Sequence, residues 1–166
     1  MQMIARKVVF GLAMLAGLAT GGAVRADQSQ LAVSAGTWQT LRDNYRKPEF
    51  DIDYRSGLNL LWVIRPHVGV LAAGDGDYYA YGGFVADIPV MGPFVLTLNT
   101  AIGGYGGNGY KLGSHFEFRN GAELSYRLPG DWRVGAGFYH ISNAGITREN
   151  GGSESALFVV TAPLPW

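Results

Sequence analysis

The sequence predicts an all-β fold: an eight-stranded antiparallel transmembrane β-barrel that follows a cleaved signal peptide. Three observations favour this class. Glycine accounts for 25 of the 166 residues, which disfavours a helical protein because each glycine inside a helix costs about 1 kcal/mol. Apolar and polar residues alternate with a period of two over long segments, as in strands with two unlike faces. Short and long connections also alternate, which is typical of barrels that cross a membrane.

The composition excludes several other classes of protein. The chain is 48% hydrophobic and 13% aromatic, which argues against disorder, and its length suits one domain. Because it contains no cysteine, it can form no disulfide, thiolate metal site or cysteine nucleophile. Its 13 basic and 13 acidic side chains balance, so there is no electrostatic basis for binding nucleic acid.

Residues 1–26 are predicted to be a signal peptide. Arg6 and Lys7 form a basic start, an apolar run follows, and Ala26 ends the small residues of a cleavage site. A membrane anchor is the alternative, but glycines thin the apolar run. Cleavage would leave residues 27–166 as the outer-membrane β-barrel domain, with 10 basic and 13 acidic side chains.

The alternation defines the expected strands in order. In one segment Phe50 and Ile52 alternate with Asp51, Asp53 and Arg55, so one face is apolar and the other charged. We expect strands at residues 29–39, 48–64, 67–74, 77–88, 93–103, 114–128, 132–142 and 153–166.

The connections between these strands fall into two groups. Tight turns are expected at residues 65–66, 89–92 and 128–131. Longer polar or glycine-rich loops are expected at residues 40–47, 104–113 and 143–152, and a shorter one at residues 74–77. The last strand contains Pro163 and Pro165, which we expect where the ladder needs no amide donor.

The apolar faces are predicted to contact lipid. A soluble exported ligand-binding barrel would bury these faces and would need only short strands, whereas the strands expected here reach the about 9–11 residues of a membrane strand. The charged faces mix both signs, as in Glu117, Arg119 and Glu123, which suits a packed polar interior. After residue 26, no apolar run reaches the ~18 residues of a membrane helix.

Three residues with chemical potential lie on these apolar faces. His140 and Ser142 share one face of the seventh strand, and Glu154 lies on the apolar face of the eighth, all beside the same loop. Exposing such side chains to lipid is costly unless they lie near the interface. Their placement therefore indicates a functional site.

The spacing of these residues permits the chemistry of a serine esterase. His140 and Ser142 are two residues apart, which separates their Cα atoms by about 6.6 Å. If the hairpin is symmetric about Thr147, His140 directly opposes Glu154, with Cβ atoms about 5 Å apart. Ser142 would then be the nucleophile, His140 the general base and Glu154 the carboxylate that orients the base.

The segment His-Ile-Ser-Asn-Ala-Gly at residues 140–145, with a glutamate fourteen residues after the histidine, resembles the lipid A 3-O-deacylase family called PagL. Members are eight-stranded outer-membrane barrels that hydrolyse the acyl chain ester-linked at the 3 position of lipid A. The resemblance implies that His140, Ser142 and Glu154 are catalytic. It also implies neighbouring positions that act around the oxyanion, namely Asn143, Gly145 and Asn150.

The resemblance is specific over residues 113–158 and loose over 58–112. One departure is Gly151-Gly152, where members often have a proline after the asparagine. Phe138 lies on the same face as His140 and is expected to contact the acyl chain of the substrate.

These observations predict a multi-pass protein of the Gram-negative outer membrane that deacylates lipid A of lipopolysaccharide without a metal or other cofactor. A homodimer is compatible with the sequence. The alternatives left open are a non-catalytic small barrel, such as an adhesin or structural protein, and an enzyme that transfers the acyl chain to another lipid.

Overall fold

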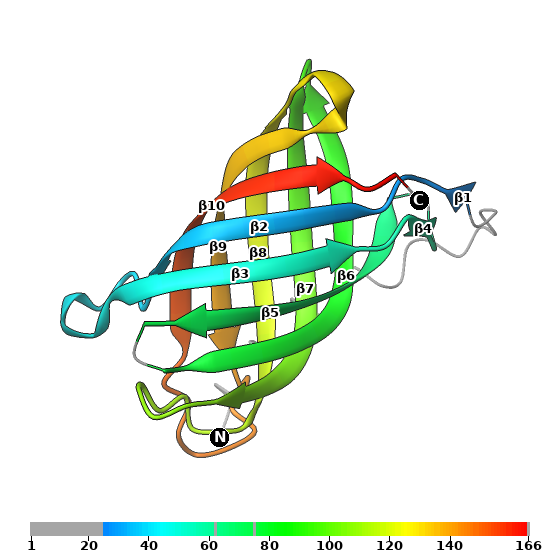
Figure 1. The fold of residues 1–166 in the computed structure, drawn as a ribbon. Helices are drawn as coiled ribbons and strands as arrows, with labels where there is room; N and C mark the ends of the chain where they lie inside the picture. The colour runs from blue at the N-terminus through cyan, green and yellow to red at the C-terminus, as the bar shows by residue number, and fades with distance from the viewer. Residues whose placement is uncertain (1–24, 62, 75, 166) are drawn as a thin grey trace.

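The computed structural model describes residues 25–166 except Trp62, Asp75 and Trp166. Most of the expected signal peptide, and the expected end of the last strand at Trp166, therefore lie outside the described residues. Eight strands close into an antiparallel barrel (Figure 1), which confirms the predicted fold class. The barrel strands are β2 (Gln30–Trp38), β3 (Lys47–Arg55), β5 (Ile64–Ala73), β6 (Tyr78–Met91), β7 (Phe94–Gly106), β8 (Phe116–Arg127), β9 (Arg133–Ser142) and β10 (Ser153–Pro163).

The barrel follows chain order and closes through pairing of β10 with β2. Two short strands, β1 (Arg25–Ala26) and β4 (Leu58–Asn59), pair with each other outside the barrel. Two 3-10 helices lie in connections, η1 (Asp43–Tyr45) and η2 (Pro129–Asp131). Across the described part of the chain, no helix has the length and apolar character needed to cross a membrane.

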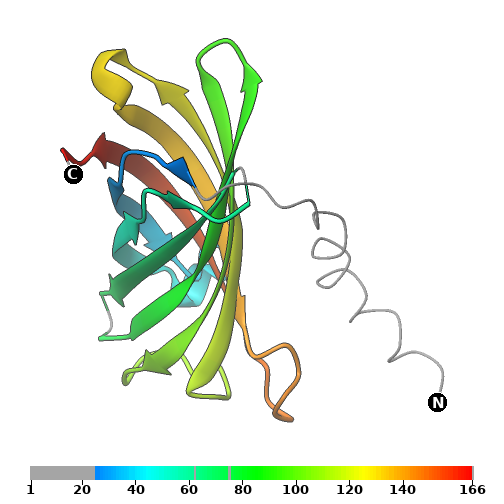
Figure 2. The ribbon, with the colours of Figure 1, turned by 90° about the vertical axis from the view of Figure 1, so that its right-hand side faces the viewer.

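The connections sort into a loop end and a turn end of the barrel. The loop end holds residues 39–46, 74–77, 107–115 and 143–152. The turn end holds residues 56–63, 92–93 and 128–132, together with the start of β2 and the end of β10. Figure 2 shows the β6–β7 turn and the β9–β10 loop extending at opposite ends of the barrel.

The expected turn at residues 65–66 is wrong. Arg65 and Pro66 lie inside β5, and the chain reverses instead at residues 56–63. Pro66 fits a strand here because its carbonyl accepts from Ser56 N, one residue beyond the end of β3. In an antiparallel strand the N and O atoms of one residue point toward the same neighbouring strand. The N–H that Pro66 lacks would therefore point toward Ser56, beyond the end of β3, where no strand hydrogen bond is lost.

The charged faces form the interior, as predicted. In β3, Asp51, Asp53 and Arg55 are buried, whereas Phe50 and Ile52 are exposed. The charges inside are paired. Arg119 lies 2.7 Å from Asp51 and Arg55 lies 2.7 Å from Glu123, both across the barrel, and Arg55 also lies 3.0 Å from Asp53 on its own strand. The interior therefore contains compensated charges, together with clusters of buried aromatic and aliphatic side chains such as Trp38, Tyr79 and Ile141.

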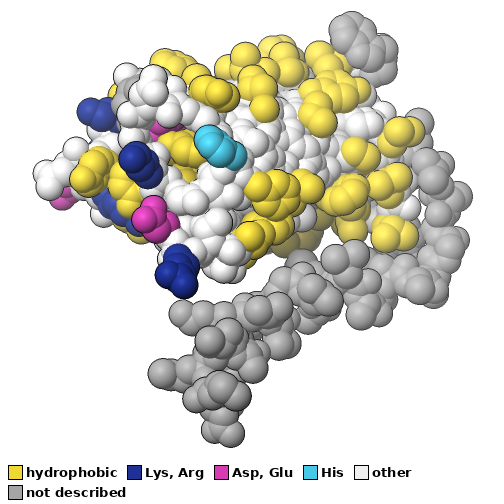
Figure 3. Space-filling model, turned by 90° about the horizontal axis from the view of Figure 1, so that it is seen from below, with side chains coloured by type: hydrophobic (Ala, Val, Ile, Leu, Met, Phe, Trp, Pro, Cys, Tyr) yellow, Lys and Arg dark blue, Asp and Glu magenta, His cyan; other side chains and the backbone are white. Residues whose placement is uncertain are grey.

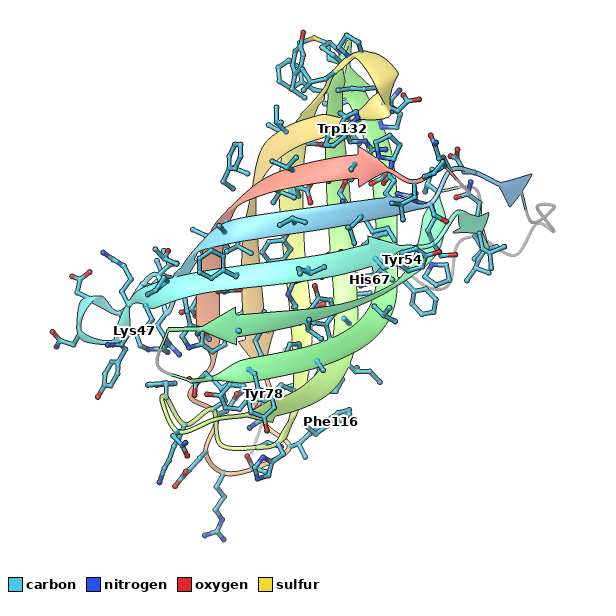
Figure 4. The ribbon with its side chains drawn as sticks, viewed as in Figure 1. Lys47, Tyr54, His67, Tyr78, Phe116 and Trp132 are labelled. Carbon is cyan, nitrogen blue, oxygen red and sulfur yellow. The ribbon has the colours of Figure 1, made fainter. Side chains whose placement is uncertain are left out.

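The outer wall is apolar and has aromatic residues toward both ends. Figure 3 shows hydrophobic side chains over one face of the wall, with charged side chains gathered at one end. In Figure 4, Tyr78 and Phe116 lie toward the loop end, and Tyr54 and Trp132 lie toward the turn end. All four are exposed. This distribution is the one expected of a barrel whose wall contacts lipid between two interfaces.

Candidate active site on the outer wall

His140 and Glu154 are directly paired across β9 and β10. His140 Nδ1 lies 3.3 Å from Glu154 Oε1, and this pairing is the one that symmetry about Thr147 predicts. The His140 side chain is 47% exposed and that of Glu154 is 16% exposed. The imidazole is therefore accessible from the outer wall, while the carboxylate lies partly beneath it.

Ser142 is the last residue of β9 and lies two residues from His140 on the same face. It is half-buried and pairs with Phe118 of β8. Phe138 is 46% exposed on this face, whereas Tyr139 and Arg133 point into the barrel and are buried. The structure thus brings His140, Ser142 and Glu154 together on the lipid-facing side, with Phe138 one pleat closer to the turn end.

Gly152 closes the loop against the histidine. Its φ is +62°, and a Cβ at this position would lie 3.2 Å from His140 Cε1. Glycine adopts a positive φ without the steric cost that other residues have. The close approach therefore explains a glycine here, at the position where the sequence departs from the family pattern.

Arg42, in the loop between β2 and β3, holds the other side of the glutamate. Its Nη1 donates to Glu154 Oε2 at 3.4 Å and to the Gly152 carbonyl at 2.9 Å, and its Nη2 donates to the Gly151 carbonyl at 2.6 Å. The guanidinium also lies 5.1 Å from the centre of the Tyr110 ring. Arg42 carries no signal in the sequence, because its contact with Glu154 depends on closure of the barrel between β10 and β2.

The loop after Ser142 is held by asparagine side chains. Asn143 is buried, its Nδ2 donates to Thr147 Oγ1 at 2.8 Å, and its Oδ1 accepts from Gly145 N at 2.9 Å. Asn150 Oδ1 accepts from Asn143 N at 3.2 Å. The asparagines and the Gly145 amide are thus engaged within the loop.

Ala144 has a φ of +54° in this turn. A positive φ in a residue other than glycine is uncommon and concentrates at functional sites. Among the described residues, no hydrogen-bond acceptor is seen for the Ala144 amide. This amide, two residues after Ser142, is therefore free to donate a hydrogen bond to a ligand.

A serine, an imidazole and a carboxylate in this order are able to perform nucleophilic acyl transfer. The fold and the site together define a class: a membrane β-barrel with hydrolase-type side chains on its outer wall. The family model for lipid A 3-O-deacylase (PagL) matches residues 29–163. The chain belongs to this family and is an outer-membrane protein.

Solved structures agree with the fold. The crystal structure of the outer membrane enzyme PagL is similar with a TM-score of 0.61 and 14% identity, covering 81% of this chain and 99% of that one. A designed transmembrane β-barrel gives a TM-score of 0.61 at 8% identity, covering 84% and 98%. Neisserial surface protein A gives 0.54 at 13% identity, covering 86% and 100%. No curated protein matches the chain.

Proposed function

We propose that this protein hydrolyses the ester that links an acyl chain to the 3 position of lipid A. Membership of the lipid A 3-O-deacylase family supports the substrate and the reaction. The observation that supports the residue assignment is the pairing of His140 with Glu154 beside Ser142 on the outer wall. A lipid in the membrane reaches that wall directly, so the substrate has no need to enter the barrel.

The reaction has two steps. Ser142 Oγ attacks the ester carbonyl while His140 takes its proton, and the tetrahedral intermediate collapses to an acyl-serine. In that collapse His140 gives the proton to the leaving sugar oxygen, which departs as a hydroxyl. Water, activated by His140, next cleaves the acyl-serine to a free fatty acid and restores Ser142.

Glu154 and the loop amides have supporting roles. Because the carboxylate faces Nδ1, it favours the tautomer in which Nδ1 bears hydrogen and Nε2 accepts the proton of Ser142. It also stabilises the imidazolium that forms. We assign the oxyanion donor to the Ala144 amide, which has no acceptor among the described residues, and the contacts of Asn143, Gly145 and Asn150 support the turn that contains it.

The orientation in the membrane follows from the substrate. Lipid A lies in the outer leaflet, so the loop end faces the cell exterior, and the ester lies at the level of Ser142, just below the glucosamine. Phe138, one pleat further toward the turn end, contacts the acyl chain. We also infer cleavage after Ala26, which N-terminal sequencing of the membrane-extracted protein tests.

Mass spectrometry of lipid A from cells that express the protein tests the function. We expect loss of the acyl chain at the 3 position and release of the free acid in cells with the wild-type protein, and unchanged lipid A with Ser142→Ala. Appearance of the acyl chain on another lipid would indicate transfer instead of hydrolysis. Unmodified lipid A with the wild-type protein correctly inserted would contradict the proposal.

A further inference from the structure

Polar side chains on the outer wall are confined to one side of the barrel. Every outward position of β3, β5 and β6 holds an apolar residue, tyrosine, proline or glycine. The outward positions of the other barrel strands include six with Ser, Thr, Asn, His or Glu, namely Thr37, Thr100, Asn120, His140, Ser142 and Glu154. Three of these have no part in the mechanism described above: Thr37, whose hydroxyl hydrogen-bonds with that of Thr40, and the neighbouring pair Thr100 and Asn120.

Thr100 and Asn120 continue the row that His140 and Glu154 begin. Thr100 pairs with Asn120 across β7 and β8, Asn120 pairs with His140 across β8 and β9, and His140 pairs with Glu154. Side chains paired in this way have Cβ atoms about 4.5–5.5 Å apart. The row therefore crosses four strands at one level, and Asn120 flanks His140 on the side away from Glu154.

The amide of Asn120 is oriented by its neighbour. Thr100 Oγ1 donates to Asn120 Oδ1 at 2.9 Å, which occupies the oxygen of the amide. Within the described part of the chain, no acceptor is seen for Asn120 Nδ2. Both side chains are exposed, so the amide presents its two hydrogens at the outer wall.

A donor in this position indicates the kind of group that it binds. A polar side chain that faces lipid is costly unless it finds a hydrogen-bond partner. The acceptors available from lipids are carbonyl and hydroxyl oxygens near the headgroup, and phosphate oxygens further out. The Thr100–Asn120 pair has no formal charge, so it matches a neutral carbonyl better than a phosphate, which favours Arg or Lys.

We propose that Asn120, oriented by Thr100, binds a second acyl carbonyl of the substrate while the scissile ester lies against Ser142. This inference rests on the proposed function, since it places the same lipid over β7, β8 and β9. The bound group is an amide- or ester-linked acyl carbonyl adjacent to the one that is cleaved. Asn120 thus selects lipids with neighbouring acyl chains over lipids with a single one.

Comparison of two substrates tests this role. Purified protein in detergent is assayed on lipid A and on a p-nitrophenyl acyl ester, which has one carbonyl. In Asn120→Leu and Thr100→Val, we expect the ratio of kcat/KM for lipid A to that for the small ester to fall about 3- to 10-fold, mainly through KM, as loss of one neutral hydrogen bond implies. Leu98→Val, two residues from Thr100 on the same face of β7, is the matched control and keeps the ratio.

The outcomes of this assay distinguish failure of the Asn120 subsite from failure of the proposed function. An unchanged ratio in Asn120→Leu, or an equal fall with both substrates, would overturn the subsite. Wild-type protein that cleaves neither substrate would instead contradict the proposed function, and the subsite is then decided by binding alone.

Binding is measured in Ser142→Ala, without turnover. The Asn120 side-chain NH2 resonances are observed by NMR in dodecylphosphocholine micelles, whose detergent has no carbonyl. We expect lipid A to shift these resonances more than an equal amount of lysophosphatidylethanolamine, which has a single acyl chain, does. No shift with lipid A, or equal shifts with both lipids, would overturn the proposal.

Discussion

At the scale of the residue, the three side chains of the proposed triad are expected to contribute unequally to catalysis. Ser142→Ala and His140→Asn each remove a group that bonds to or protonates a reacting atom, so each lowers hydrolysis by several powers of ten. Glu154→Ala removes only the group that orients His140, so we expect its fall in hydrolysis rate to be about 10²-fold smaller than that of the other two variants.

Esterase assays of the purified variants check this order, and heat-modifiable mobility on gels verifies that each barrel is folded. Because the residues act as a unit, Ser142→Ala combined with His140→Asn should cost little more than either change alone. Full activity in Ser142→Ala would exclude the serine mechanism.

A second prediction at this scale concerns the two faces of β9. Phe138 faces outward and Tyr139 inward. Phe138→Arg places a charge on the acyl-binding wall, which costs up to about 2–4 kcal/mol at mid-membrane and less near an interface, so deacylation should fall. Tyr139→Phe removes only an interior hydroxyl, 3.4 Å from Glu123 Oε2, and should cost at most ~1 kcal/mol of stability with turnover within a few-fold.

Fluorescence quenching distinguishes the faces directly. The chain has no cysteine, so a single cysteine at position 138 or 139 takes a fluorophore selectively. Lipid-soluble quenchers should reach the label at 138 and not at 139. The reverse result would place His140 and Ser142 inside the barrel and remove the basis for lateral access.

At the scale of the element, Arg42 links the β2–β3 loop to the β9–β10 hairpin by hydrogen bonds. Arg42→Met removes the donors to Glu154 and to the carbonyls of Gly151 and Gly152. We expect turnover to fall about tenfold, since each hydrogen bond to a charged group contributes about 1.5–3 kcal/mol when buried and less when exposed. Arg42→Lys should recover part of the loss.

Arg46→Met is the matched control for this measurement. Arg46 belongs to the same loop but donates to the Thr40 carbonyl and to Asp43 within that loop. Kinetics of the three variants on lipid A check the prediction. Equal losses in Arg42→Met and Arg46→Met would show that the loop as a whole, rather than its contact with Glu154, supports turnover.

A further prediction concerns the shape of the β9–β10 loop. In Gly152→Ala the new Cβ would lie 3.2 Å from His140 Cε1, in a backbone with φ of +62°. We expect the imidazole to be displaced and hydrolysis to fall, while the barrel stays folded. Gly76→Ala is the control, because Gly76 has a φ of +88° but nothing within 4 Å of its Cβ position.

The two glycine variants share backbone strain of roughly 1–2 kcal/mol, as a left-handed conformation costs a residue with a Cβ. Only the new Cβ of Gly152→Ala would contact His140. Esterase rates and thermal unfolding are measured for both. Activity retained in Gly152→Ala would mean that the loop yields without moving His140.

At the scale of the whole molecule, the barrel depends on its compensated interior. Arg55 is 2% exposed and contacts both Asp53 and Glu123. Arg55→Leu leaves the buried Glu123 carboxylate without its ion-pair partner and Asp53 with His67 alone, so we expect a loss of about 3–5 kcal/mol in the free energy of unfolding. Arg127→Leu, at an exposed position near the turn end, should change it by less than about 0.5 kcal/mol.

Urea-induced unfolding in lipid vesicles measures both changes. A destabilisation of Arg55→Leu no larger than that of Arg127→Leu would mean that water or protonation replaces the guanidinium inside the barrel.

The sequence by itself determined the barrel class, the lipid-facing side of the strands with clear alternation (β3, β8, β9 and β10) and the opposition of His140 and Glu154. These features follow from a period of two along one strand and from the symmetry of one hairpin, both of which are local. The same local reasoning failed at Arg65-Pro66, because whether a proline interrupts a strand depends on where the neighbouring strand ends.

Only the tertiary structure decided which other strands flank the site. Arg42 meets Glu154 because the barrel closes between β10 and β2. Thr100 and Asn120 lie beside His140 because the register of β7, β8 and β9 pairs Thr100 with Asn120 and Asn120 with His140. Relative shifts between strands depend on the closure of all eight strands, so no single segment of sequence contains them.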